Sequence, residues 1–228
     1  MAVREFGNPE GEAVLVFGGI GPNFKVLDKM CAQLGAAGYR VFSVDYPSTY
    51  HSIRELADNH VSPFIEELPI NRNKPLHIVT LSMGGILTRA YLRENRPENL
   101  GRVVMIAPPN HGSEVADWLK FVGLFRWGFG PAGMELTTDA NSTPNALGPA
   151  NFDVGVIAGK RSLDPWFSWM FRGPHDGKVS VDSARLDGMA DFAVVNSDHY
   201  LITRNAQTIA LTKCFLQHGH FGSNVASN

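Results

Sequence analysis

Short apolar runs alternate along the chain with longer stretches in which apolar residues recur at helical spacing. The runs are rich in β-branched residues and have few polar positions, as is typical of strands covered on both faces. They span residues 12–19, 40–47, 76–82, 102–109, 152–159 and 191–197. Helical spacing is found over residues 23–39, 52–68, 84–93 and 201–219. Alternating strands and helices predict an α/β fold with a mostly parallel sheet of about six strands flanked by helices.

One region interrupts this alternation. Residues 111–150 contain no strand pattern and include the aromatic run WLKFVGLFRWGFG, and a second aromatic run, PWFSWMF, spans residues 165–171. Both follow the carboxyl end of a predicted strand, where α/β sheets bind their ligands. We therefore expect an insert or lid-like region at about 111–150, although aromatic residues also pack over sheets without contacting a ligand. The candidate substrate-binding residues in the two runs are Phe125, Trp127, Trp166 and Trp169.

Composition and charge narrow the class of protein. The chain has 228 residues, of which 44% are hydrophobic and 18% charged, and its net charge is −2. These values predict a single globular domain over residues 1–228 and give no sign of a nucleic-acid partner. No apolar run has the roughly 20 residues of a membrane span, and the first residues lack a signal-peptide pattern, so a cytoplasmic location is expected. Cys31 and Cys214 lie in apolar helical contexts, which favours buried thiols over a disulfide.

The stretch LHIVTLSMGGILTRAYL contains the first candidate catalytic residue. A predicted strand ends at Leu81, a predicted helix begins at Gly84, and only Ser82 and Met83 lie between them. Such a tight connection requires strained backbone, and the glycines let the two elements approach closely. Ser82 is therefore either a nucleophile on a sharp turn or a polar residue that caps the helix.

A nucleophilic serine needs a base, which in turn needs a carboxylate to orient it. His199 follows the last predicted strand, at the edge of the sheet where Ser82 is expected, and it is the candidate base. His111 and His175 lie in loops on the same side of the sheet and are its competitors.

Asp176 is the candidate carboxylate, because it lies in a glycine-flanked loop after the strand of residues 152–159. Asp182 is better explained as an acid in the first turn of a helix. Asp198 is next to the candidate base in the sequence, so its side chain is expected to point elsewhere. Asp164 remains a further alternative.

An oxyanion hole completes the candidate site. The sequence FGGIGPN follows the first predicted strand, and its glycines allow backbone amides to approach a substrate oxygen. The candidate donors are the amides of Ile20 and Met83. The same loop could be an ordinary glycine turn, or part of a dinucleotide site with Asp45 ending the next strand. However, Phe24 occupies the position of the third glycine of that motif, and Pro22 interrupts the loop.

Together these motifs resemble the α/β-hydrolases, in particular the small bacterial lipases and carboxylesterases. TLSMGG is similar to the family's nucleophile elbow, HDGKV to its acid loop and SDHYLI to its histidine loop, and they occur in the family's order. GGIG is similar to the oxyanion loop, and APPNHGSEVADWL resembles a recurrent segment of these proteins. The resemblance extends from about residue 13 to residue 221 and implies a three-layer α/β-hydrolase fold.

The sequence departs from the family pattern at several positions. Thr80 replaces the first glycine of G-x-S-x-G, where strand and helix crowd each other, and is expected to shift the elbow. Leu81 and Gly18 replace histidines that often occur before the serine and before the oxyanion glycine. The first strand recognised in the sequence is the one before the oxyanion loop, which implies a compact version of the fold without the family's first two strands.

The resemblance implies hydrolysis of carboxylic esters with apolar acyl groups. Ser82, His199 and Asp176 would act as a catalytic triad through an acyl-enzyme, without a metal or other cofactor. The expected partner is a small-molecule ester or lipid, with transient contact to a lipid interface as a further expectation and the oligomeric state undetermined. The alternatives are a thioesterase, acyltransferase or amidase with the same triad, and a binding protein that has the fold without activity.

Overall fold

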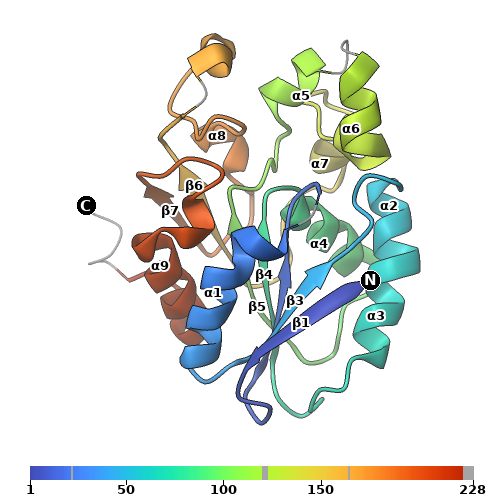
Figure 1. Cartoon of the computed structure of the whole chain (residues 1–228), viewed down its shortest axis with the longest axis vertical. Helices are drawn as coiled ribbons and strands as arrows, with labels where there is room; N and C mark the ends of the chain where they lie inside the picture. Colours follow the sequence, from blue (N-terminus) through green and yellow to red (C-terminus); the bar gives the residue numbers. More distant parts are fainter. Residues whose placement is uncertain (22, 120–122, 164, 223–228) are drawn as a thin grey trace.

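A twisted sheet forms the middle layer of the molecule in the computed structural model, which describes residues 1–21, 23–119, 123–163 and 165–222 (Figure 1). Seven strands of the described chain are ordered β1-β3-β2-β4-β5-β6-β7. They are β1 (Ala2–Gly7), β2 (Ala13–Phe17), β3 (Arg40–Asp45), β4 (Leu76–Leu81), β5 (Leu100–Ile106), β6 (Val154–Gly159) and β7 (Asp191–Val195). Neighbouring strands from β3 to β7 are parallel, which confirms the predicted α/β class.

Strand β1 was not predicted. It pairs antiparallel with β3 at the edge of the sheet and precedes β2, so the expectation that the oxyanion strand comes first in the chain is corrected. Five of its six residues are exposed, and its charged side chains bind neighbours: Arg4 pairs with Asp28, and Glu5 pairs with Arg40. An edge strand can form its backbone hydrogen bonds without burying side chains, so it leaves no apolar run in the sequence.

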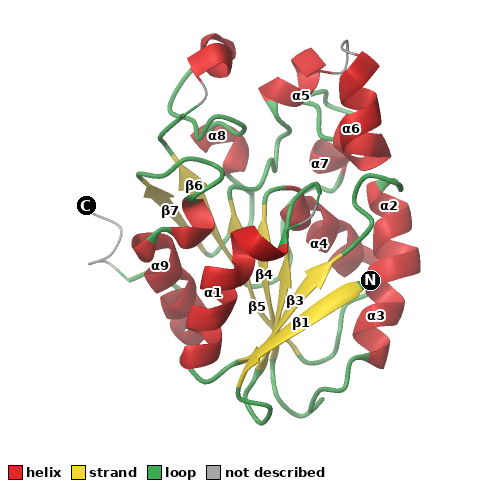
Figure 2. Cartoon of the chain, viewed as in Figure 1, coloured by secondary structure: helices red, strands yellow, loops and turns green. Residues whose placement is uncertain are grey.

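Helices cover both faces of the sheet (Figure 2). Along β2, Val14 and Val16 belong to one core, and Leu15 and Phe17 belong to the other, as expected when strand side chains alternate between two buried faces. One face is packed by α1 (Phe24–Ala36) and α9 (Ala206–His218). The other is packed by α2 (Ile53–Leu56), the π-helical turn η1 (Ala57–Val61), α3 (Ser62–Glu67), α4 (Met83–Glu94) and α8 (Val181–Ala184). The fold therefore has the three layers that the sequence predicts.

The segment 111–150 lies beyond the carboxyl ends of the strands (Figure 1). It contains α5 (Glu114–Leu119), α6 (Gly123–Met134) and α7 (Thr143–Ala146), and its described residues form no strand. Helix α6 is interrupted at Gly130, whose φ of 64° and ψ of −172° are not helical. A Cβ at Gly130 would lie 1.9 Å from the carbonyl oxygen of Thr49, so only glycine permits this close contact with the loop after β3.

A short 3-10 helix, η2 (Pro165–Met170), rises beside this segment (Figure 1). In the described part of the chain, no helix has the length and apolar character needed to span a bilayer.

Candidate active site

Ser82 lies on a strained turn between β4 and α4. It is a non-glycine residue with positive φ, at φ 54° and ψ −126°, and this conformation costs of the order of 1–3 kcal/mol. Helix α4 starts at the next residue, and a Cβ at Gly84 would lie 2.6 Å from the carbonyl oxygen of Gly18. The missing side chain at Gly84 therefore lets α4 begin directly against the end of β2 and presents the serine above the sheet.

Thr80 occupies the position of the first glycine of the G-x-S-x-G pattern, just before this turn. Its side chain is almost completely buried, and its hydroxyl has no hydrogen-bond partner in the part of the chain that the structure describes. A Cβ at Gly85 would lie 3.4 Å from Thr80 Oγ1 and 3.0 Å from Cβ of Pro108. A side chain at position 85 would therefore press mainly on Pro108, so the second glycine after the serine lets α4 pack closely against the segment after β5.

Asp176 and His199 are in direct contact. Asp176 Oδ2 lies 2.7 Å from His199 Nδ1, and the His199 amide donates to the Asp176 carbonyl at 3.0 Å. The other carboxylate oxygen, Oδ1, accepts the amides of Lys178 at 2.9 Å and Val179 at 2.8 Å. Only 2% of Asp176 is exposed, so the carboxylate is fixed by these three donors and has almost no contact with solvent. The contact orients the His199 ring with Nε2 as its free nitrogen.

The competing histidines are placed elsewhere. His111 is exposed, and its Nδ1 lies 3.0 Å from Oδ1 of Asn145. His175 stacks on Phe171 with ring centroids 4.0 Å apart, and partial burial lowers its pKa. Neither residue lines the pocket that contains Ser82.

The competing carboxylates also have other partners. Asp198 is buried and its Oδ1 accepts the amides of Tyr200 at 3.0 Å and Leu201 at 3.1 Å, so it caps the turn after His199. Asp182 lies in the first turn of α8, as predicted. Asp164 lies outside the described residues.

The glycine loop after β2 lies against the serine. A Cβ at Gly19 would lie 3.2 Å from Cβ of Ser82 and 3.5 Å from its Oγ. The amide of Ile20 comes directly after Gly19, and the amide of Met83 comes directly after Ser82. Neither amide donates a hydrogen bond to any described residue. Both amides therefore remain available for a substrate oxygen.

Two residues that sequence reasoning missed fix this loop. The side chain of Asn23 accepts from the Gly19 amide at 3.2 Å and donates to the Gly19 carbonyl at 3.0 Å, and it also donates to the carbonyl of Gly21. The Tyr46 hydroxyl donates to the carbonyl of Gly18 at 2.7 Å, and its complete burial raises its pKa. The position of Asn23 next to the glycines could have indicated its role. Tyr46 lies in the loop after β3, far from the glycines in the sequence.

The same contacts argue against a dinucleotide site. The Gly19 amide is bonded to Asn23, and the Gly21 amide donates to Ser48 Oγ at 2.9 Å, so these amides do not face a ligand. No group of three or more metal-ligating side chains is found among the described residues.

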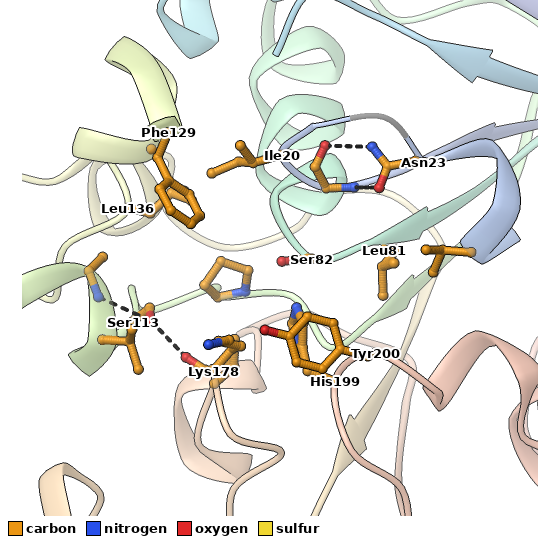
Figure 3. Close-up of a pocket in the computed structure, with 17 residues that line it drawn as sticks. Ile20, Asn23, Leu81, Ser82, Ser113, Phe129, Leu136, Lys178, His199 and Tyr200 are labelled. Carbon is orange, nitrogen blue, oxygen red and sulfur yellow. Dashed lines mark hydrogen bonds between the residues drawn. The ribbon is translucent and has the colours of Figure 1, made fainter. Parts of the chain in front are cut away.

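A pocket of about 380 Å³ opens above Ser82 (Figure 3). The Ser82 oxygen lies between two walls of different chemistry. Ile20, Phe129 and Leu136 form an apolar wall, and His199, Lys178 and Tyr200 lie opposite (Figure 3). Ser82 Oγ makes no hydrogen bond within the described chain, and catalytic hydrogen bonds are often formed only when substrate binds.

The pocket differs in part from the predicted substrate-binding set. The side chains of Phe125, Trp127 and Trp166 lie outside the described part of the structure. Trp169 is 73% exposed and does not line the pocket. The insert contributes Phe129, which belongs to the same aromatic run as Phe125 and Trp127 but was not among the predicted residues.

A comparison with family models matches residues 14–220 to the Alpha/beta hydrolase family. The match includes most of β2, all of β3 to β7 and the candidate site, so the chain belongs to this family. A comparison with curated protein sequences finds no match.

Solved structures with the same fold include three hydrolases. The mature lipase BlEst2 of Bacillus licheniformis superposes with a TM-score of 0.71 at 19% identity, covering 94% of this chain and 98% of that one. The phospholipase PlaB of Legionella pneumophila gives 0.66 at 16%, covering 89% of this chain and 57% of that one. A thermophilic esterase of Thermogutta terrifontis gives 0.60 at 13%, covering 96% and 93%. The chain thus spans nearly all of the first and third proteins and little more than half of the second.

Proposed function

We propose that this protein hydrolyses carboxylic esters with Ser82 as nucleophile, His199 as base and Asp176 as the orienting carboxylate. One observation carries the proposal: a serine on a strained turn shares a pocket with a histidine whose Nδ1 lies 2.7 Å from a buried aspartate. Neither a helix cap nor a structural serine requires such a histidine–aspartate pair. The fold shared with lipases and esterases is consistent with this activity.

In the first half-reaction, His199 Nε2 accepts the Ser82 proton as Oγ attacks the ester carbonyl. The charge that develops on the carbonyl oxygen is stabilised by the amides of Ile20 and Met83, which donate to no other group among the described residues. Asp176 keeps the proton of neutral His199 on Nδ1 and stabilises the imidazolium form. The imidazolium then protonates the leaving alcohol, and an acyl-enzyme remains on Ser82.

Water completes the reaction. His199 deprotonates a water molecule, which attacks the acyl carbonyl, and the proton returns to Ser82 as the acid leaves. The apolar wall of Ile20, Phe129 and Leu136 fits a hydrocarbon acyl group. We further propose that residues 1–228 form one hydrolase domain, in which segment 111–150 covers the acyl site, because Phe129 and Leu136 come from this segment.

Turnover of a p-nitrophenyl ester series, from acetate to palmitate, tests the proposal. Wild type should release p-nitrophenol and Ser82→Ala should not, although both should unfold at similar temperatures. The chain length with the highest kcat/KM then measures how much of the apolar wall the acyl group covers. Equal rates for wild type and Ser82→Ala would rule out Ser82 as the nucleophile.

A further inference from the structure

Asn23 occupies the N-cap position of α1, but its side chain does not cap the helix. Within the described chain it accepts no hydrogen bond from the first turn of α1, although asparagine is a favoured N-cap residue. Asn205 has the same position in α9, and its Oδ1 accepts the amides of Gln207 and Thr208. Only 7% of Asn23 is exposed, and it lines the pocket above Ser82. Its buried amide therefore serves a partner other than the helix that it begins.

That partner is the glycine loop after β2. The side-chain oxygen of Asn23 accepts the Gly19 amide at 3.2 Å, and its nitrogen donates to the Gly19 carbonyl at 3.0 Å (Figure 3). The nitrogen also donates to the Gly21 carbonyl. A backbone N–H can only donate and a carbonyl oxygen can only accept, so these partners fix which end of the side-chain amide faces which group. A Cβ at Gly18 would lie 2.1 Å from Cγ of Asn23, so only glycine leaves room for the asparagine.

The hydrogen bond to the Gly19 carbonyl also orients the Ile20 amide. The two groups belong to one peptide unit, which is planar and trans, so its N–H points away from its C=O. A Cβ at Gly19 would lie 3.5 Å from Ser82 Oγ, and Ile20 lines the pocket, so this unit lies beside the nucleophile. If the unit turned over, its carbonyl oxygen would replace the N–H and repel a developing oxyanion. Glycine offers little steric resistance to that rotation.

Asn23 is the main donor to this carbonyl. The Tyr46 hydroxyl lies 3.4 Å from the Gly19 oxygen but 2.7 Å from the Gly18 oxygen, and its single proton goes to the nearer acceptor. Loss of the Asn23 side chain therefore releases the Gly19 carbonyl and leaves the Gly18 carbonyl bound.

We propose that Asn23 is a positioning residue, which holds the Gly19–Ile20 peptide unit in the orientation that lets the Ile20 amide bind the oxyanion. This inference rests on the proposed ester hydrolysis at Ser82. A donor that is already oriented stabilises the transition state without a cost of reorganisation during the reaction. The hydrogen bond from Asn23 supplies this orientation before substrate arrives.

Two other roles would explain the same contacts. If Asn23 only stabilises the fold, its loss lowers the free energy of unfolding and leaves kcat unchanged. If Asn23 binds the substrate directly from the pocket wall, its loss raises KM. A positioning residue acts on the transition state, so its loss lowers kcat and leaves KM nearly unchanged.

Four proteins separate these roles: wild type, Asn23→Ala, Asn23→Ser and Asn205→Ala. Serine caps a helix as well as asparagine does, but its single hydroxyl cannot bind both the amide and the carbonyl of Gly19. Asn23→Ser therefore keeps a good start for α1 without fixing the peptide unit. Asn205→Ala is the control for lost stability, because Asn205 caps a helix and is not among the described residues that line the pocket. Rates with p-nitrophenyl butyrate give kcat and KM, and urea unfolding reports on the fold.

A pair of ketone inhibitors gives a readout that a purely structural role would not change. Ser82 Oγ adds to the carbonyl carbon of hexyl trifluoromethyl ketone, and His199 Nε2 takes the serine proton. The π electrons of the C=O bond move to its oxygen, which becomes the oxyanion of a hemiketal. Hexyl methyl ketone has the same chain but forms this adduct far less readily, so it measures binding of the chain. The ratio of the two inhibition constants therefore reports on the oxyanion site.

In Asn23→Ala and Asn23→Ser, kcat should fall by roughly 10–100-fold and KM should change by less than about threefold, since losing a whole oxyanion donor costs about 10²–10³ in kcat. The trifluoromethyl ketone should bind more weakly by a factor similar to the loss in kcat, and the methyl ketone should bind as in wild type. Asn205→Ala should unfold at a lower urea concentration and keep the kcat and both inhibition constants of wild type.

Three results would overturn the inference. Both Asn23 variants could keep the wild-type kcat and affinity for the trifluoromethyl ketone, or KM and the affinity for the methyl ketone could worsen as much as kcat. Asn205→Ala could also lose as much kcat as the Asn23 variants, which would indicate a general effect of stability. With wild type active and Ser82→Ala inactive, these results leave the proposed function standing. If wild type hydrolyses no ester, the proposed function fails and the inference fails with it.

Discussion

Replacing Asp176 by asparagine should reverse the tautomer of His199. The amides of Lys178 and Val179 both donate to Asp176 Oδ1, at 2.9 and 2.8 Å, so the asparagine must keep its carbonyl oxygen there. Its NH₂ group then faces His199 Nδ1, at the position where Oδ2 lies at 2.7 Å. Two N–H groups cannot face each other at this distance, so Nδ1 must become the acceptor and the ring proton moves to Nε2. A protonated Nε2 cannot accept the proton of Ser82.

The loss should be large because nothing else can correct the tautomer. Asp176 is 2% exposed, so water cannot replace the missing acceptor. We expect kcat to fall by about 10⁴-fold, as in related triads, which corresponds to about 5 kcal/mol of transition-state stabilisation. The fold should be kept, because the variant retains both backbone hydrogen bonds to Oδ1.

Initial rates with p-nitrophenyl butyrate between pH 6 and 9 measure this loss, and circular dichroism checks the fold. Asp198→Asn is the matched control: this buried carboxylate accepts the amides of Tyr200 and Leu201, and asparagine caps such turns well, so its activity should stay within about threefold of wild type. More than a tenth of wild-type kcat in Asp176→Asn, or an equal loss in Asp198→Asn, would refute the assignment of the carboxylate.

Three further predictions follow from buried groups and the pocket. Thr80→Val removes a buried hydroxyl that has no partner among the described residues and should raise the free energy of unfolding by about 1 kcal/mol in urea; a decrease would mean that the hydroxyl does form a hydrogen bond. Phe129→Ala should lower kcat/KM for p-nitrophenyl octanoate relative to acetate by about tenfold, while Trp169→Ala should not, and equal effects would contradict the pocket wall. Burial lowers the pKa of His77, so the folded state favours the neutral imidazole. The stability that His77 contributes is therefore present above about pH 6.5 and is lost as pH falls below that value. His77→Gln should flatten this part of the stability curve in urea titrations, and an unchanged slope would show that His77 is not responsible.

The sequence predicted the parts of the molecule that depend on local pattern. Buried parallel strands need continuous apolar runs, so β2 to β7 were recognisable. The strand–serine–helix junction at Ser82 is likewise local, since the serine must lie between a strand end and a glycine. The contact between Asp176 and His199 was expected from their order and from the edge of the sheet that both occupy. The catalytic roles of all three residues remain predictions until activity is measured.

Features that depend on contacts between distant segments were not predictable. Strand β1 has exposed side chains, and only its pairing with β3 makes it a strand. Tyr46, in the loop after β3, anchors the glycine loop after β2, and nothing near Tyr46 in the sequence indicates this contact. The effect of Thr80 on the elbow stays a prediction; Thr80 is buried, and Ser82 has a positive φ of 54°. Phe129 lines the pocket directly before the break at Gly130, and its place in the aromatic run did not single it out.

Covalent labelling of Ser82 tests the central claim most directly. A fluorophosphonate reacts with a serine only when a base removes its proton and an oxyanion site stabilises the adduct. Wild type should gain the mass of one phosphonyl group, located on the peptide that contains Ser82, while Ser82→Ala should gain none and His199→Ala should react far more slowly. Labelling of another serine, or equal labelling of wild type and His199→Ala, would contradict the account.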